Sequence, residues 1–344
     1  MNLYWAVYKN LENEVIKLAE NIHFDDKQIN TYSIHISDLL IRTAVEIEAI
    51  SRELYKESGG NMNFVDDHGN PRKPYFDSDC IQYLDQNWHI TKKVVNVVAA
   101  NFYFEKEENR ILKPLKDCNK QKLGRWKKAY QAVKHDRTGS LSAGNIGNLI
   151  RAMAALYVLN LYKKEDNPEE QASGGTFDMS RGSDLFSVKS FVATSLKMDE
   201  HMNDGSIIIP VKCKRQECID ESVYIDRYTK ESFLELHRNH MKDSEITMKN
   251  IIESAELQNY LQEHVEDKEI PLSEICIKCG EDLERKRLNI GADTVNIVEE
   301  DREKIKQAGI NMLCKIFSFY YTTQGEKAKR ELVLNKLQQI YPCV

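Results

Sequence analysis

Apolar residues recur at spacings of three and four along the first residues of the chain, which is typical of an amphipathic helix. The members of this repeat are Tyr4, Val7, Leu11, Val15 and Leu18. A second helix is expected after Ser37 and Asp38, a suitable N-cap, and it should end at Gly59-Gly60. Its apolar face would comprise Leu40, Ala44, Ile47, Ser51 and Leu54.

The following residues predict further helices. Residues 61–74 are rich in Asn, Asp, Gly and Pro and should form a loop. Residues 78–104 predict one or two helices, although the β-branched run weakens this signal; the expected stripe is Val94, Val95, Val98 and Phe102. The next two helices should bury Trp126, Tyr130 and Val133, and then Leu149, Met153, Leu156 and Leu159. Residues 1–165 therefore predict an up-and-down helical bundle.

A polar, Pro- and Gly-containing stretch at residues 166–175 is expected to be a linker. Beyond it the pattern changes to short runs rich in Val, Ile, Phe and Tyr, at residues 185–194, 206–213 and 222–228. From Lys230 onward the pattern is helical again, including residues 306–321 and 329–342. We therefore expect a mainly α protein, in which the bundle precedes a smaller α+β domain (176–344) with a short antiparallel sheet and C-terminal helices.

Composition indicates an ordinary globular protein, with 41% hydrophobic and 30% charged residues. The sequence has neither a leader pattern nor an apolar run that could span a bilayer, so a cytoplasmic protein with reduced thiols is expected, without membrane contact. The formal net charge is −6, yet ten Lys or Arg and two acidic residues lie between Arg110 and Arg137. This local excess of eight positive charges in 28 residues is the strongest signal in the composition.

Two segments of the predicted bundle resemble the HEPN superfamily. They are AVEIEAISRELY at residues 44–55 and WKKAYQAVKHDR at residues 126–137. The resemblance implies a helical bundle that often dimerises and that, in active members, is a metal-independent endoribonuclease of toxin–antitoxin or phage-defence systems. The family's catalytic signature is an Arg followed by four to six residues and a His. This chain departs from it, because nine residues separate Arg125 from His135.

The candidate catalytic group is centred on His135. A neutral imidazole could take the proton of an RNA 2′-hydroxyl, while Lys134 and Arg137 stabilise the developing charge, so that cleavage would leave a 2′,3′-cyclic phosphate. Glu48 could be their partner from a neighbouring helix, and Arg125 could reach His135 only across a dimer axis. In the alternative interpretation His135 caps a helix end, Glu48 is solvated, and the bundle is a noncatalytic module for dimerisation or protein interaction.

The basic run gives a second set of candidates, for holding RNA phosphates and stacking a base. They are Lys113, Lys116, Lys120, Lys122, Trp126, Lys127, Lys128 and Tyr130. The spacing of the two aromatic residues also suits a helix core, and the cations could be a solvated face. Partners are expected to be RNA, a second copy of the chain, and a protein partner for the C-terminal domain (176–344), which would serve as a sensor or partner domain.

No cofactor is expected. The Cys276-x2-Cys279 pair has the form of a zinc knuckle and could combine with Cys213 and Cys218 in a four-thiolate site. The competing interpretation, which we prefer, is that residues 271–286 start a helix whose apolar face carries Cys276 and Cys279.

Overall fold

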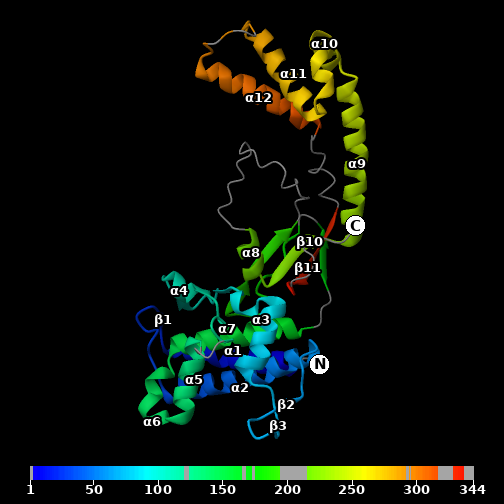
Figure 1. Ribbon diagram of the computed structural model, residues 1–344. Helices are drawn as coiled ribbons and strands as arrows, with labels where there is room; N and C mark the ends of the chain where they lie inside the picture. Colours follow the sequence, from blue (N-terminus) through cyan, green and yellow to red (C-terminus); the bar gives the residue numbers. More distant parts are fainter. Residues whose placement is uncertain are drawn as a thin grey trace. The chain divides into compact units, whose positions relative to one another are not determined.

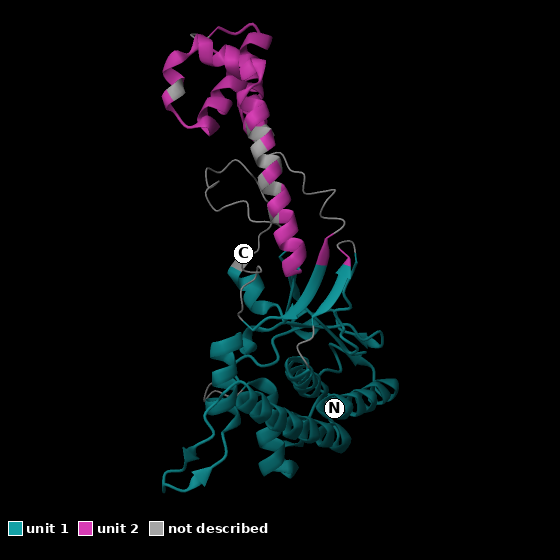
Figure 2. Ribbon diagram, turned by 90° about the vertical axis from the view of Figure 1, so that its right-hand side faces the viewer, with its two compact units in different colours: residues 1–171, 175–228, 330–343 teal, residues 172–174, 229–329, 344 magenta. Residues whose placement is uncertain are grey.

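The computed structural model describes residues 3–119, 124–164, 168–172, 175–193, 215–291, 294, 296–316 and 328–336. The chain is mainly helical with small sheets, as the sequence predicted (Figure 1). It divides into two compact units (Figure 2). Unit 1 comprises residues 1–171, 175–228 and 330–343, and unit 2 comprises residues 172–174, 229–329 and 344. Within the described residues, no helix combines the length and the apolar composition that crossing a membrane requires.

The core of unit 1 is helical, and its main helices are α1 (Leu3–Asn21), α2 (Ile34–Glu57), α5 (Arg125–His135) and α7 (Ile146–Lys163). Helix α7 packs against the other three (Figure 1). Every residue of α7 except Arg151 and Lys163 is buried, so this helix is enclosed on nearly all sides and forms the centre of the unit. The buried positions predicted for α5 and α7 are confirmed, as are Leu11, Val15 and Leu18 of α1, whereas Tyr4 and Val7 are half-buried.

Helix α2 begins earlier than expected. Its N-cap is Ser33 rather than Ser37, because the Ser33 side chain accepts a hydrogen bond from the backbone N–H of Ile36 at 3.1 Å. Ser37 is fully buried inside the first turn. The C-terminal end is as predicted, since Ser58 is the C-cap and Gly59 adopts a φ of 86°, which glycine tolerates best.

The predicted helical stripe through Val94 and Phe102 is wrong. Within residues 78–104 the α-helix α3 ends at His89, whose left-handed φ of 50° terminates it. The chain then forms β4, in which Val95 pairs with Leu112 of β6 and Val188 of β8. β-branched residues fit this pleated surface once partner strands are supplied. The elements of this stretch are η1 (Phe76–Ile81), α3 (Gln82–Trp88), η2 (Ile90–Lys92), β4 (Val95–Val97) and β5 (Phe102–Tyr103).

Unit 1 also contains a four-stranded sheet in the order β7-β11-β10-β9. Its strands are β7 (Glu169–Ala172), β11 (Lys329–Leu334), β10 (Tyr224–Tyr228) and β9 (Ser190–Ala193). Strand β10 is antiparallel to β11 but parallel to β9, so the sheet is mixed rather than antiparallel. The helix expected over 329–342 is wrong at 329–334, where β11 pairs along its length with β10. The strand expected at 206–213 lies outside the described residues.

The division into units does not follow the expected boundary at residues 166–175. Residues 175–228 belong with the N-terminal helices, because β8 (Phe186–Val188) pairs with β4. Unit 2 is inserted in the sequence between the paired strands β10 and β11. Smaller elements of unit 1 are β1 (Phe24–Asp25), β2 (Phe64–Val65), β3 (Pro71–Arg72), α4 (Glu107–Arg110), β6 (Ile111–Leu112), α6 (Arg137–Ser140), η3 (Leu141–Ala143) and α8 (Arg215–Glu221).

Unit 2 is built from helices, as predicted for the residues after Lys230. They are α9 (Lys230–Ile252), α10 (Ala255–Glu263), η4 (Val265–Glu269), α11 (Leu272–Arg287) and α12 (Glu299–Ile316). Its core contains Ile251, Leu257, Tyr260, Ile275, Cys276, Cys279 and Met312. Helices α11 and α12 approach closely at Gly280, where a Cβ would lie 2.6 Å from the Ala308 carbonyl oxygen.

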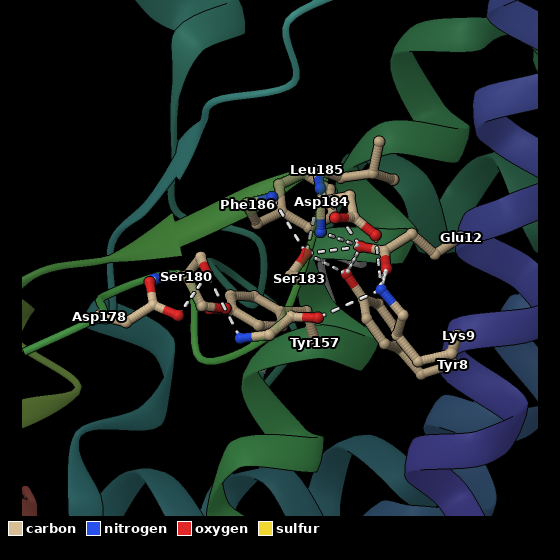
Figure 3. A network of polar contacts seen from close by, with 11 residues as sticks. Tyr8, Lys9, Glu12, Tyr157, Asp178, Ser180, Ser183, Asp184, Leu185 and Phe186 are labelled. Carbon is tan, nitrogen blue, oxygen red and sulfur yellow. Dashed lines mark hydrogen bonds and ion pairs between the residues drawn. The ribbon is translucent and has the colours of Figure 1, made fainter.

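A buried carboxylate fixes α1 to a loop that precedes β8 (Figure 3). Glu12 is fully buried and accepts hydrogen bonds from the Ser183 hydroxyl at 2.6 Å and from the backbone N–H of Asp184 at 3.0 Å. Tyr8 donates to the same carboxylate at 2.8 Å, and Lys9 forms an ion pair with it. The network joins residues that are more than 170 positions apart, so it ties helix α1 to the segment that leads into β8.

Candidate functional site

Helix α5 positions most of the residues expected at a functional site. Trp126 and Tyr130 are each 2% exposed, and Trp126 donates from Nε1 to the Pro114 carbonyl oxygen at 2.8 Å. The alternative that these two rings belong to the core is therefore confirmed. Arg125 and Lys128 are exposed on the other side of the helix. Lys120 and Lys122 lie outside the described residues.

An open groove of about 1390 Å³ lies beside the N-terminal end of α5, and we call it the basic groove. It is lined by residues from β4, α4, β6, α5, α7 and α8 and by residues of the segments next to them. Its cationic side chains are Lys106, Lys113, Lys116, Arg125, Arg151 and Lys189. Its acidic side chains are Glu107, Glu108, Asp117 and Glu221. The groove therefore has an excess of positive charge in a chain whose overall charge is negative.

The positive charge is unevenly balanced along the groove. Glu221 forms ion pairs with Lys113 at 2.8 Å and with Lys189 at 2.7 Å. Burial would raise the pKa of Glu221, but the hydrogen bonds from these two lysines lower it. By contrast, Arg125 and Lys116 have no ion pair with any residue of the described chain. Arg125 and Lys116 are therefore not neutralised by a direct ion pair within the described residues, although Glu107, Glu108 and Asp117 also line the groove.

Arg151 enters the basic groove from the apolar helix α7. Its guanidinium donates to the carbonyl oxygens of Gly147 and Glu108, each at 2.9 Å, and to Oδ1 of Asn109 at 2.8 Å. Burial lowers its pKa, and the positive charge of Arg125 lowers it further, to about 10. The positive charges of Arg125 and Arg151, which line the same groove, therefore repel each other.

A second, smaller hollow of about 390 Å³ lies between α2, α5 and the residues around β3, and we call it the α2–α5 pocket. Glu48 lines it, as does Gln131. Lys127 also lines it but is 5% exposed, because it pairs with Asp77 at 2.8 Å and lies over the Phe76 ring. Lys127 therefore serves packing within unit 1 rather than an open cationic surface.

Residues 134–137, which we call the KHDR residues, lie where α5 ends and α6 begins. His135 is exposed, and its Nε2 lies 3.1 Å from Oε1 of Gln131. Arg137 pairs with Asp38 of α2 at 2.7 Å, rather than with the proposed partner Glu48. Lys134 lies over the Tyr130 ring, 5.4 Å from its centre. Arg125 is ten positions from His135, a rise of about 15 Å along the helix, so the structure does not bring these two residues together.

The candidate zinc ligands are not assembled in the described chain. Cys276 and Cys279 are buried in α11, and burial raises the pKa of both thiols, to about 11 for Cys279. The helical interpretation of this segment is confirmed. Cys218 is disulfide-bonded, contrary to the expectation of reduced thiols, and Cys213 lies outside the described residues. Within the described ranges, no cluster of His, Cys, Asp and Glu side chains could hold a metal ion.

Three cations of the basic groove were missed from the sequence: Lys106, Arg151 and Lys189. They lie outside the basic run of residues 110–137. A signal existed for Arg151, since it is the single charged residue in an apolar stretch that runs from Ile146 to Tyr162. Comparisons of the chain with protein-family models, with curated proteins and with solved structures found no match.

Proposed function

We propose that the chain is an RNA-directed effector of the HEPN type, as used in toxin–antitoxin or phage-defence systems, and that it holds RNA in the basic groove. The observation that carries the proposal is the groove itself, with six cations around an open hollow of about 1390 Å³. Lys113, Lys116 and Arg125, which were proposed from the sequence, all line it. Cations gathered on one surface attract the phosphate backbone independently of sequence.

In this proposal His135 supplies the chemistry where RNA is cut. Its exposed imidazole would take the proton of a 2′-hydroxyl, and the resulting alkoxide would attack the adjacent phosphorus and expel the 5′-oxygen of the next nucleotide. Lys134 and Arg137 would stabilise the charge on the phosphorane. No metal ion takes part in these steps. Arg125 would contribute only to the His135 of a second copy, across a two-fold axis.

A second candidate function is a noncatalytic HEPN module that binds RNA or protein. The observation that favours it is the engagement of the KHDR residues, since His135 contacts Gln131 and Arg137 pairs with Asp38. Both candidates share the helical bundle and the dimer, and they differ in whether RNA is cut.

RNA binding is the direct test. Fluorescence anisotropy of a labelled single-stranded RNA should show binding by the wild-type chain that weakens steeply as salt rises. A Lys113→Gln/Lys116→Gln variant should bind more weakly and with a smaller salt slope. The matched control is Lys17→Gln/Arg42→Gln, which removes the same charge from exposed positions of α1 and α2. Absence of binding, or a flat salt response, would contradict the proposed function.

A further inference from the structure

We infer that Arg125 and Arg151 form a clamp for a phosphate group of RNA at one end of the basic groove. The inference rests on the proposed function and identifies which residues of the groove contact the RNA phosphate. Neither residue belongs to the KHDR run, and Arg151 comes from a helix that is otherwise apolar between Ile146 and Tyr162.

The Arg151 guanidinium is held in place before any ligand arrives. Three of its five N–H donors are used by Gly147, Glu108 and Asn109. Asn109 is itself fixed, because its side-chain amide donates to Asp26 at 2.7 Å. Asp26 also accepts from the backbone N–H groups of residues 105 and 106, at 2.8 and 2.9 Å. This chain of contacts orients Arg151 and leaves two N–H donors for an external acceptor.

The charge at this place calls for an anion. The acceptors that hold Arg151 are two carbonyl oxygens and an amide oxygen, all neutral. Arg125 lowers the pKa of Arg151 by more than the nearby Glu108 raises it. Lys106 and Lys116 add two further cations to the same lining, which also contains the acidic Glu107, Glu108 and Asp117. A phosphate between the two guanidinium groups would relieve their repulsion and accept hydrogen bonds from both.

The groove is suited to the phosphate rather than to a base. Among its described lining residues Trp126 is the single aromatic side chain, and it is 2% exposed with its Nε1 bound to Pro114. No aromatic face is therefore open for stacking along this part of the described chain. RNA held here should be recognised with little dependence on its sequence.

The test compares Arg125→Gln and Arg151→Gln with Arg42→Gln, a control that removes an exposed cation paired with Glu14. Each clamp variant should bind a short single-stranded RNA about tenfold more weakly or worse, whereas the control should bind as the wild type does. The salt slope should fall by about 0.7 for each lost contact with a single strand. Arg125 is exposed, so its replacement tests the clamp even if Arg151→Gln fails to fold.

Two further binding measurements identify which phosphate of the RNA the clamp holds. Oligonucleotides of U, A and C should bind within about threefold of one another, because the contact is to the backbone. Equal binding of RNAs with a 5′-phosphate and a 5′-hydroxyl supports an internal diester, and a preference for the 5′-phosphate that both clamp variants lose supports a terminal monoester. A strong base preference, or unchanged RNA affinity in both clamp variants, would overturn the inference while leaving RNA binding in place.

Inorganic pyrophosphate tests the clamp without RNA. It should raise the melting temperature of the wild-type chain and of Arg42→Gln but not that of Arg125→Gln. If the wild type binds no RNA but responds to pyrophosphate in this way, the proposed function fails and the phosphate site stands. If it responds to neither, both are overturned.

Discussion

The carboxylate of Glu12 accepts the hydroxyl of Ser183 at 2.6 Å, and both side chains are buried. Ser183 in turn accepts from the backbone N–H of Phe186 at 3.1 Å, at the start of β8 (Figure 3). Helix α1 is thereby joined to the strand that completes the three-stranded sheet with β4 and β6. A buried carboxylate with this many donors is costly to remove, because each donor is then left without an acceptor.

Replacing Glu12 should therefore destabilise unit 1. We expect Glu12→Ala to lower the free energy of unfolding by about 3 to 5 kcal/mol and Ser183→Ala by about 1 to 2 kcal/mol. Glu14→Ala is the control, since Glu14 is in a partly exposed pair with Arg42 and should change stability by less than about 1 kcal/mol. Urea unfolding followed by tryptophan fluorescence reports on unit 1, which contains all three tryptophans. Equal midpoints for Glu12→Ala and Glu14→Ala would contradict the prediction.

Acid should weaken the contact between α8 and the segment after α3. Asp220 binds Lys92 and His89, each at 2.8 Å. Burial would raise its pKa, but these hydrogen bonds lower it to about 2. Because the pKa is about 3.9 in an unfolded chain, the stabilisation is present above about pH 4 and is lost as the pH falls toward 2.

The stability difference between the wild type and Asp220→Asn should accordingly shrink from about pH 6 to about pH 2.5. The measurement is the midpoint of urea unfolding at each pH. Asp67→Asn, in an exposed position of the β2–β3 hairpin, serves as the control. A difference that stays constant over this range would show that Asp220 does not act through its charge.

Gly280→Ala should destabilise unit 2 alone. The new Cβ would lie 2.6 Å from the Ala308 carbonyl oxygen and 2.9 Å from the Cα of Gly309, and neither is a flexible side-chain end. Such overpacking costs about 1 to 3 kcal/mol. We expect an earlier loss of helical circular dichroism while the tryptophan signal of unit 1 is unchanged. Gly291→Ala, whose Cβ would meet only Thr294 at 3.6 Å, should behave as the wild type.

If the chain cuts RNA, His135→Ala should abolish cleavage, because loss of a positioned base typically costs a factor of about 10² to 10⁴. RNA affinity should persist, since the basic groove is unaltered. The assay is cleavage in EDTA, with products analysed for a 2′,3′-cyclic phosphate, and His68→Ala as an exposed control. Cleavage that needs Mg²⁺, or full activity of His135→Ala, would exclude this chemistry in favour of the noncatalytic module.

The proposed two-fold dimer is tested by light scattering at micromolar protein. The proposed HEPN resemblance implies a dimer built from the same helix of both copies, and isologous contacts are the commonest symmetry. It would also bring the positive charges of the two copies close together. A strict monomer across the concentration range would remove the one route by which Arg125 could serve His135.

The sequence alone determined α1, α2, α5 and α7 and most of their buried faces. Helical hydrogen bonds are local, so a period of three to four residues predicts both the element and its buried side. The same reasoning placed Trp126 and Tyr130 in the core as the better of two interpretations. It misplaced the start of α2, since Ser33 and Ser37 are both acceptable N-caps and only the packing of Ser37 decides between them.

The runs at residues 185–194 and 222–228 were correctly expected to hold strands, but only the tertiary structure decided how the strands pair, the strands β4 and β11, and the basic groove. Val95 could join a helix or a strand, and its partners Leu112 and Val188 are distant in the sequence, so a local pattern cannot identify them. Strands β10 and β11 are separated in the sequence by the inserted unit 2. Their pairing cannot be predicted from a local pattern for the same reason. The groove combines Lys113, Arg125, Arg151 and Lys189 from separate elements. Their charges can be counted in the sequence, but which of them are neutralised and which remain open to a ligand depends on contacts that form only when the chain folds.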